Sequence, residues 1–242
     1  MSRPNLLEEG LIKLRESDTD IDVILAPRFE KVISLLDAYT GEIELFNPAY
    51  GLVGTQDHDE LVIKHILDSI APLGIIYRLL KEQNSIDNET PARIADVGSG
   101  AGLPGIPLAV CLPDTPFTLI ERMGRRSVFL RNALAKLGIT NTEVEEKEME
   151  KAAPNRFNLI TFRAFRPLEK SILKGLSRLR TKDGILAAYK GRREKIDEEM
   201  AAAEKISIGK TAGKKLFTWE AIPCPVPFLE GERHLLTIKF TN

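Results

Sequence analysis

An acidic residue followed by spaced glycines is the feature of this sequence that most directly suggests chemistry. The stretch 94–110, IADVGSGAGLPGIPLAV, is apolar, then glycine-rich, then apolar again, which predicts a strand, a tight turn and a helix. Asp96 closes the strand, and Gly98, Gly100 and Gly102 follow it. Glycines permit positive φ and close backbone approach, and the start of the next helix offers free N–H groups. The pattern therefore predicts a cofactor-binding turn.

The spacing of these glycines separates two kinds of cofactor. A dinucleotide turn reads G-x-G-x-x-G, but Leu103 stands at its third glycine position. The pattern present, Asp96 followed by G-x-G-x-G, resembles motif I of the S-adenosylmethionine-dependent methyltransferases. An acid at this place can balance a cationic cofactor, and backbone near the glycines can accept its methionyl end. A structural turn, and the turn of another nucleotide enzyme such as an oxidoreductase, remain as alternatives.

Glu121 ends the next expected strand and suits the ribose of such a cofactor. One carboxylate can accept hydrogen bonds from both ribose hydroxyls. Rossmann dehydrogenases use the same device, so Glu121 by itself does not distinguish the two cofactors.

The helices and strands that are expected around these residues divide the chain into two unlike parts. Residues 5–81 carry helical apolar spacings, and the polar stretch 81–93 reads as a loop. After residue 92, strands and helices alternate, which predicts a parallel sheet wrapped by helices. The expected strands are 93–98, 117–121, 142–146, 157–162, 184–190, 216–222 and 234–240, and the expected helices between them are 105–112, 125–138, 168–179 and 193–206. The last two strands lack a convincing helix between them, so we expect an antiparallel hairpin at a sheet edge.

The composition is that of an ordinary globular protein. The 242 residues are 43% hydrophobic and 29% charged, and the formal net charge is −1, so any basic surface for nucleic acid must be local. Cys111 and Cys224 form neither a close pair nor a metal-binding spacing. The sequence shows no signal peptide and no apolar run of membrane-spanning length, and we therefore expect a cytoplasmic protein.

Several stretches, taken in order, resemble the RsmG (GidB) family of bacterial methyltransferases, which modify N7 of a guanine in 16S ribosomal RNA. The glycine turn continues as GSGAGLPGIPLA over 98–109, as in that family. The other matching stretches are KHILDSI (64–70), MGRRSVFLRNALAKLGITN (123–141), FRAFRPLEKSI (162–172), AAYKG (187–191) and GERHLLTIKF (231–240). The chain departs from the family pattern at Phe46, where the family often has Trp, at Gly51, which replaces a second Asn, and at Arg125, which replaces Lys.

This resemblance implies an α/β fold of the class I (Rossmann-like) methyltransferases. We expect a mostly parallel seven-stranded sheet with helices on both faces in residues 91–242, preceded by an N-terminal helical extension in residues 1–90. The implied reaction moves a methyl group from S-adenosylmethionine to guanine N7 in 16S ribosomal RNA or the small subunit, and the enzyme is expected to act as a monomer. A non-catalytic RNA- or ribosome-binding factor with a retained cofactor pocket is the alternative.

The resemblance also implies which residues form the site. The family places an acid after the third strand, beside the adenine, and Glu150 is the better match, with Glu148 and a solvated charge run as alternatives. The expected cofactor-binding residues are Asp96, Gly98, Ser99, Gly100, Gly102, Leu103, Glu121, Glu150 and Arg163. The expected RNA-binding residues are Arg125, Arg126, Arg163 and Lys190, and no metal site is expected.

Methylation at N7 needs no general base, because N7 already carries a free lone pair and no proton has to leave. Such an enzyme relies on positioning and electrostatics. Consistent with this, the fourth strand ends in ITFRAFRPL, without the Asn/Asp-Pro-Pro-aromatic motif of many enzymes that methylate exocyclic nitrogens. Arg163 is the expected catalytic residue there, recognising guanine O6 or a phosphate, since a bidentate contact to O6 and N7 would block the reaction. A salt bridge to a nearby carboxylate is the alternative.

Further basic residues follow the same strand ends. They are Arg122, Arg125 and Arg126, then Arg163 and Arg166, then Lys190, Arg192 and Arg193. Three clusters at one sheet edge predict a footprint for RNA phosphates, although solvated surface charge would look alike. His65 and Asp68 lie three residues apart on an expected helix and therefore share a face. They either hold the helical extension to the catalytic domain or border the active cleft.

Overall fold

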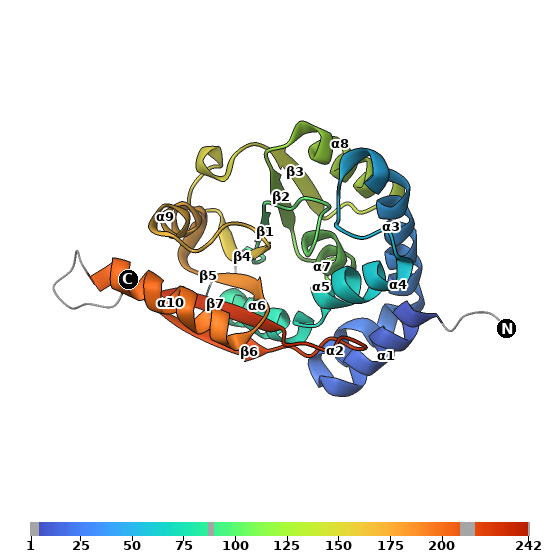
Figure 1. Ribbon diagram of the computed structural model, residues 1–242, viewed down its shortest axis with the longest axis horizontal. Helices are drawn as coiled ribbons and strands as arrows, with labels where there is room; N and C mark the ends of the chain where they lie inside the picture. The colour runs from blue at the N-terminus through green and yellow to red at the C-terminus, as the bar shows by residue number, and fades with distance from the viewer. Residues whose placement is uncertain (1–4, 87–89, 209–215, 242) are drawn as a thin grey trace.

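A computed structural model describes residues 5–86, 90–208 and 216–241 of the chain. Among these residues the fold is a seven-stranded sheet with helices on both faces, and the strand order is β3-β2-β1-β4-β5-β7-β6 (Figure 1). The strands are β1 (Ile94–Val97), β2 (Phe117–Glu121), β3 (Thr142–Glu146), β4 (Phe157–Arg163), β5 (Arg180–Lys190), β6 (Phe217–Pro223) and β7 (His234–Phe240). The expected α/β class and the mostly parallel sheet are confirmed.

Helices precede the sheet and then alternate with its strands. Before the sheet lie α1 (Leu6–Ser17), α2 (Thr19–Leu25), the 3₁₀ turn η1 (Ala26–Arg28), α3 (Phe29–Tyr50), α4 (His58–Leu61), the π-helical turn η2 (Val62–Leu67), α5 (Asp68–Ile70) and α6 (Leu73–Ile86). Between the strands lie α7 (Gly105–Cys111), α8 (Gly124–Leu137), the 3₁₀ turn η3 (Met149–Lys151), α9 (Lys170–Leu179) and α10 (Arg193–Ile208).

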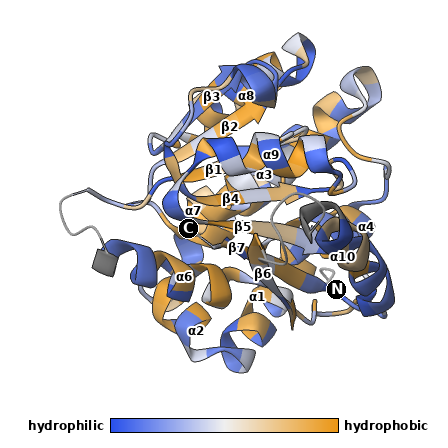
Figure 2. Cartoon of the chain, turned by 90° about the vertical axis from the view of Figure 1, so that its left-hand side faces the viewer, coloured by the Kyte–Doolittle hydropathy of each residue, from blue (hydrophilic) through white to orange (hydrophobic). Residues whose placement is uncertain are grey.

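Alternating side chains along each strand divide the core into two layers. Ile94 of β1 packs with the N-terminal helices, α7 and α8, whereas its neighbours Ala95 and Val97 pack with α9 and α10. This follows from the two-residue period of a strand, which sends successive side chains to opposite faces. Figure 2 shows the result as hydrophobic strands between helices with hydrophilic outer faces. The strand ends between these layers are where a parallel sheet presents a ligand site.

The last two strands form the expected antiparallel edge. β7 pairs antiparallel with β5 on one side and with β6 on the other, so β6 is the outermost strand. The other pairings, β1 with β2 and β4, β2 with β3, and β4 with β5, are parallel. The hairpin therefore returns the chain beside β5 and brings residues just before His234 to the carboxyl end of the parallel strands.

The helix before the sheet is longer than the sequence indicates. The polar stretch from residue 81 is expected to be a loop, but α6 continues to Ile86, and residues 87–89 lie outside the described chain. Gln83 explains the difference, because its side chain is buried and its Nε2 donates to the carbonyl of Asp183 at 3.1 Å. From the sequence alone, a polar residue whose hydrogen-bond partner lies in a distant segment is easily predicted to be in a loop.

The helical extension shares a core with the sheet. One hydrophobic cluster contains Leu7 and Leu11 of α1, Ile94 of β1 and Leu235 of β7. The division into a unit of residues 1–90 and one of residues 91–242 therefore stays a prediction.

Tyr39 of α3 ties the helical extension to the glycine turn. The side chain is fully buried, and its hydroxyl donates to the carbonyl of Ala101 at 2.7 Å. Burial raises the pKa of Tyr39 well above its ordinary value, so the hydroxyl stays protonated and able to donate.

Tyr39→Phe should lower the free energy of unfolding by about 1 to 3 kcal/mol, because it leaves a buried carbonyl without its donor. Urea unfolding at equilibrium measures this change. Tyr50→Phe is the matched control on the same helix, since the Tyr50 hydroxyl makes no hydrogen bond among the described residues. Equal stability of the two variants would contradict the structural role of the Tyr39 hydroxyl.

Candidate active site

The glycine turn between β1 and α7 has the backbone that its sequence predicts. Gly98, Gly100 and Gly102 have φ values of 72°, 58° and 93°, which residues with a Cβ rarely adopt. A Cβ on Gly98 would lie 2.5 Å from the ring of Phe165, whereas a Cβ on Gly100 would meet no atom closer than 3.9 Å. Gly98 is therefore covered by a side chain of the protein itself, and Gly100 faces open space.

Asp96 lies beneath this turn and not on its surface. Its side chain is 1% exposed, and its Oδ2 accepts from the N–H of Gly105, the first residue of α7, at 3.2 Å. Its Oδ1 accepts from the Thr161 hydroxyl at 3.3 Å. A carboxylate at a helix N-terminus is favoured by the orphan N–H groups there. Asp96 thus holds the turn against α7 from below.

Burial raises the pKa of Asp96 to about 6, although the Gly105 N–H acts in the opposite direction. The carboxyl is therefore ionised at pH 7 and neutral in mild acid. This negative charge, enclosed directly under the glycines, is suited to a cationic ligand above them.

Glu121, at the end of β2, closes the other side of the turn. It is 4% exposed, its Oε2 accepts from the Gly100 N–H at 2.9 Å, and its Oε1 accepts from the Met123 N–H at 2.8 Å. Both oxygens are thus held by backbone donors. Since each carboxylate oxygen has a second lone pair, Glu121 can still accept from a ligand.

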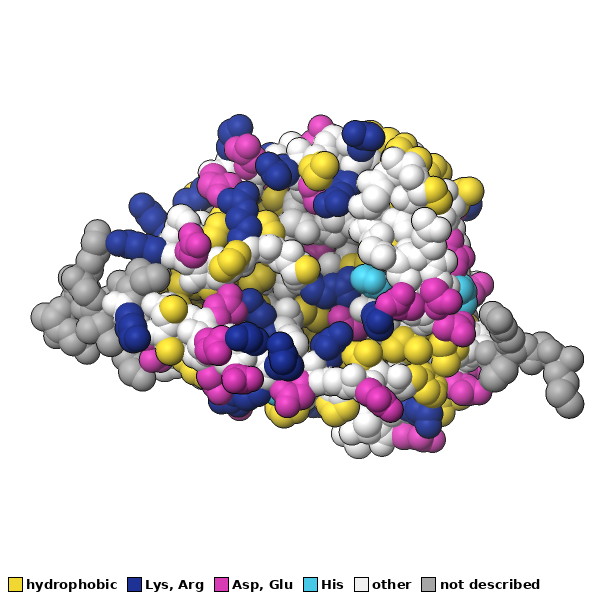
Figure 3. Space-filling view, viewed as in Figure 1, with side chains coloured by type: hydrophobic (Ala, Val, Ile, Leu, Met, Phe, Trp, Pro, Cys, Tyr) yellow, Lys and Arg dark blue, Asp and Glu magenta, His cyan; other side chains and the backbone are white. Residues whose placement is uncertain are grey.

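Two cavities meet at this turn. The larger, of about 1160 Å³, runs from the glycines past Arg163 to β5 and α10, and the smaller, of about 260 Å³, lies between the ends of β2, β3 and β4. Gly98, Arg126 and Phe165 line both cavities. Figure 3 shows this face of the molecule hollowed near its centre, with Lys and Arg side chains gathered around the hollow.

The residues present fit S-adenosylmethionine. Gly98 to Ala101 and Leu103 line the larger cavity, where the methionyl end would lie, and Glu121 lines the smaller cavity, where the ribose and adenine would lie. The Nε of Arg126 is buried without a hydrogen-bond partner among the described residues, at the junction of the two cavities. An orphaned donor of this kind suits an anionic group, whether a carboxylate or a phosphate.

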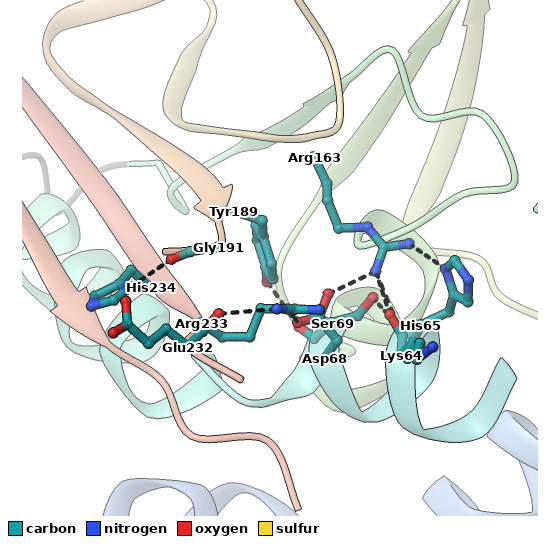
Figure 4. A network of polar contacts seen from close by, with 10 residues as sticks. All are labelled: Lys64, His65, Asp68, Ser69, Arg163, Tyr189, Gly191, Glu232, Arg233 and His234. Atoms are coloured by element: carbon teal, nitrogen blue, oxygen red, sulfur yellow. Dashed lines mark hydrogen bonds and ion pairs between the residues drawn. The ribbon is translucent and has the colours of Figure 1, made fainter. Parts of the chain in front are cut away.

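Arg163, the last residue of β4, lies in the wall of the larger cavity (Figure 4). Its Nη1 donates to Asp68 Oδ2 at 2.9 Å, and its Nη2 lies 3.1 Å from His65 Nδ1. Its Nη1 also reaches the carbonyls of Lys64 and His65, in the π-helical turn η2, at 3.4 and 3.5 Å. A π-helical turn displaces backbone carbonyls from the regular helix ladder, and such turns occur often at functional sites. The salt bridge that the sequence leaves as an alternative for Arg163 is present.

His65 is neutral beside this arginine. Burial, and then the positive charge of Arg163, lower the pKa of His65 to about 4. A neutral imidazole can accept through Nδ1, so the contact with Arg163 is a hydrogen bond from the guanidinium. His65 and Asp68 both border the cavity, and they also link the helical extension to β4. The two roles predicted for this pair, linking the helical extension to the sheet and bordering the cleft, are therefore compatible.

The remaining predicted residues are placed as follows. Arg125 is exposed near the start of α8, and Arg126 donates through Nη2 to the Gly51 carbonyl at 3.1 Å. Lys190 lines the larger cavity but pairs with Glu199 of α10 at 2.7 Å. Glu148 lines the smaller cavity. Glu150 lines neither cavity and lies 3.7 Å from Arg166, and the assignment of either glutamate to the adenine stays a prediction.

Two residues of the site were not singled out from the sequence. Arg233, just before β7, donates through Nε to Asp68 Oδ1 at 3.0 Å. Phe165 lies over Gly98 because Ala164 before it has a φ of 47°, a strained value for a residue with a Cβ. Both lie inside stretches that carry the family resemblance, GERHLL and FRAFRP, and no other signal in the sequence points to them.

Within the described residues, no group of three or more His, Cys, Asp and Glu side chains could hold a metal ion. In the same part of the chain, none of the helices combines the length and the apolar character that a membrane span requires.

Solved structures share this fold. A Methanococcus maripaludis protein, assigned as an S-adenosyl-L-methionine-dependent methyltransferase, superposes with a TM-score of 0.54. The two chains are 13% identical, and the match covers 84% of this chain and 92% of that one. An Agrobacterium tumefaciens protein assigned as an O-methyltransferase gives a TM-score of 0.51 and 20% identity, over 74% of this chain and 81% of that one. The chain therefore has the fold of the class I methyltransferases.

The chain belongs to the GidB family, rRNA small subunit methyltransferase G, whose model matches residues 32–219. A ribosomal RNA small subunit methyltransferase G of Treponema denticola is 39% identical over 86% of this chain and 87% of its own length. The enzyme of the same name from Treponema pallidum is 35% identical over 98% of this chain and 94% of its own. That of Actinobacillus succinogenes is 35% identical over 80% and 81%.

Proposed function

We propose that this enzyme transfers a methyl group from S-adenosylmethionine to N7 of a guanine in 16S ribosomal RNA of the small subunit. The observation that supports this most strongly is that the two cavities meet at the glycine turn, where Arg126, Arg163 and Arg233 line the larger one. The chain that carries this site is a member of the GidB family. S-adenosylmethionine supplies an electrophilic methyl group when bound. The side chains of this protein supply the rest, which is the positioning of the donor and of the target base.

Those side chains act by position and charge. Asp96 and Glu121 hold the turn from below and from the side, so that the donor lies in one orientation. Arg163 is the residue we assign to the target base or its phosphate, because it reaches the larger cavity from the end of β4 beside Gly98. Guanine N7 loses no proton on methylation, so none of these residues needs to act as a base. Neutral His65 is held by Arg163, which agrees with an orienting role.

Mapping of N7-methylguanosine in 16S ribosomal RNA tests the proposed reaction. Small subunits from cells that lack the gene should gain one such site when incubated with the purified protein and S-adenosylmethionine. Deproteinised 16S ribosomal RNA in a parallel reaction shows which form is the substrate. A modification pattern that is the same with and without the gene would reject the proposal.

We further propose that Arg125 and Arg126 contact RNA phosphates, together with Lys190. Arg125 is exposed near the start of α8, and Arg126 lines both cavities. The enzyme is proposed to act as a monomer in the cytoplasm, where small subunits are assembled.

Replacing Arg125 and Arg126 with alanine should weaken binding of ribosomal RNA uniformly across sequences. The slope of log K against log salt should become shallower by about one for each phosphate that the variant no longer neutralises. Filter binding at several salt concentrations measures both effects. Arg131→Ala is the control on the same helix, because Arg131 already pairs with Glu146 at 3.0 Å. An unchanged slope in the double variant would contradict the footprint.

A further inference from the structure

One buried carboxylate in the wall of the larger cavity is shared by two arginines from distant segments. Asp68, the first residue of α5, is 6% exposed. Its Oδ2 accepts from Arg163 at the end of β4, and its Oδ1 accepts from Nε of Arg233 before β7 (Figure 4). All three residues line the cavity. A single carboxyl group therefore fixes two guanidinium groups relative to each other.

The two arginines are held differently. The Arg163 guanidinium donates to Asp68, to His65 Nδ1 and to the carbonyls of Lys64 and His65. Arg233 is anchored through Nε to Asp68 and through Nη1 to the Glu232 carbonyl at 2.9 Å. Its side chain is 31% exposed, against 15% for Arg163. Arg233 is thus fixed at its base and more accessible at its tip.

The segments beside Asp68 make its position rigid. The neighbouring Ser69 carbonyl accepts from the Tyr189 hydroxyl at 2.8 Å, and the Ser69 hydroxyl donates to the His65 carbonyl at 2.6 Å. Tyr189 is on β5, so the start of α5 is tied to the sheet directly beneath the cavity. Such support limits how far the carboxylate can move, and therefore how far either arginine can move.

The charges give this arrangement a distinctive consequence. Two guanidinium groups and one carboxylate give this group of three side chains one net positive charge, at a place where an RNA substrate brings negative charge. Loss of the carboxylate charge would raise the attraction for RNA, yet it would release both arginines from their common anchor. A neutral residue in place of Asp68 should therefore strengthen the attraction for RNA and, at the same time, weaken the orientation of the two arginines.

We propose that Asp68 is a positioning residue for the RNA substrate. It holds Arg163 and Arg233 in one orientation, so that their guanidinium groups present the target nucleotide to the methyl donor. This inference rests on the proposed function, because it takes RNA as the substrate. Asp68 itself acts through the two arginines and does not contact the reacting atoms.

Steady-state kinetics of Asp68→Asn with small subunits test the proposal. We expect kcat to fall by about tenfold to a hundredfold, the usual scale for a displaced orienting group, while KM for the subunit stays the same or decreases. The Kd for S-adenosylmethionine should stay within about twofold, since the positioned arginines serve the substrate. Asp68→Glu keeps the charge and should recover part of the lost kcat.

A double-mutant cycle separates positioning from general destabilisation. In a background with Arg163→Met and Arg233→Met, Asp68→Asn should cause little further loss of kcat, because the guanidinium groups through which it acts are gone. Asp20→Asn is the matched control, since it also removes a carboxylate from an arginine, Arg78 at 2.6 Å, and neither residue lines the cavities. It should leave kcat unchanged.

Three outcomes would overturn the positioning role. They are an unchanged kcat in Asp68→Asn, a loss of the same size in both backgrounds, and a rise in KM with kcat preserved. Each of these presupposes that the unaltered protein methylates the subunit. If the unaltered protein fails to do so, the proposed function fails first and the role of Asp68 in that reaction fails with it, so the two failures are distinguishable.

Discussion

Replacing Glu121 with glutamine should weaken S-adenosylmethionine binding by about a hundredfold. Hydrogen bonds to a charged acceptor contribute about 1.5 to 3 kcal/mol each, and a glutamine can accept through only one of its two terminal atoms. Glu121 also holds the N–H groups of Gly100 and Met123, one of which loses its acceptor in the variant. The substitution therefore removes hydrogen bonds to the ribose and loosens the turn that carries them.

Isothermal titration with S-adenosylmethionine measures this loss. Glu146→Gln is a close control, because Glu146 ends β3 directly opposite Glu121 in the register of the two strands and lines neither cavity. Its affinity should match that of the unaltered protein. A Glu121→Gln variant that binds as tightly as the control would contradict the placement of the ribose beside Glu121.

The affinity for S-adenosylmethionine should fall as the pH drops below 6, by at most about tenfold for each pH unit. Burial raises the pKa of Asp96 to about 6, and protonation there removes the negative charge beneath the cationic cofactor. At pH 7.5 the Asp96→Asn variant should bind about tenfold or more weakly, and its affinity should lack this dependence on pH.

The stability of the cofactor-free protein should respond to the same titration in the opposite sense. The folded-state pKa of Asp96 lies above the ordinary value of 3.8, so between about pH 6 and pH 4 the folded state binds more protons than the unfolded state. Ionised Asp96 therefore destabilises the fold at neutral pH, and this contribution disappears as the pH falls through that range. Asp96→Asn should remove this component from the pH profile of the unfolding free energy.

Isothermal titrations with S-adenosylmethionine from pH 5 to pH 8, paired with urea unfolding over the same range, test the pH dependence of binding and that of stability together. Asp114→Asn serves as the control, because Asp114 is exposed in the loop after α7. The assignment to Asp96 is contradicted if the pH dependence of binding is the same in Asp96→Asn as in the control.

The fold could be predicted closely because its signals are local. The strands and the α-helices between them each occupy one short continuous stretch, from four residues in β1 to sixteen in α10, and glycines at positive φ mark the turn. The error at α6 has the same origin. Gln83 is polar in the sequence, and only its hydrogen bond to the carbonyl of Asp183, 100 residues later, makes it a helix residue of the interface.

The acidic run after β3 shows where local patterns stop being informative. The run 144–153 contains several glutamates, and the 3₁₀ turn η3 decides which of them faces the smaller cavity. The turn directs Glu148 to that cavity and Glu150 toward Arg166. A displacement of two residues within one acidic run cannot be read from composition or spacing.

The sheet, the glycine turn with Asp96 and Glu121, and the resemblance that identifies the family could all be predicted from the sequence. These depend on residues that are neighbours in the chain or on the period of one element. The group of Asp68, Arg163 and Arg233 could not be predicted in this way, because Asp68 meets Arg163 across 95 residues and Arg233 across 165. Those hydrogen bonds require β4 to end, and the antiparallel strand β7 to begin, beside the helix that carries Asp68, and the sheet topology supplies that arrangement.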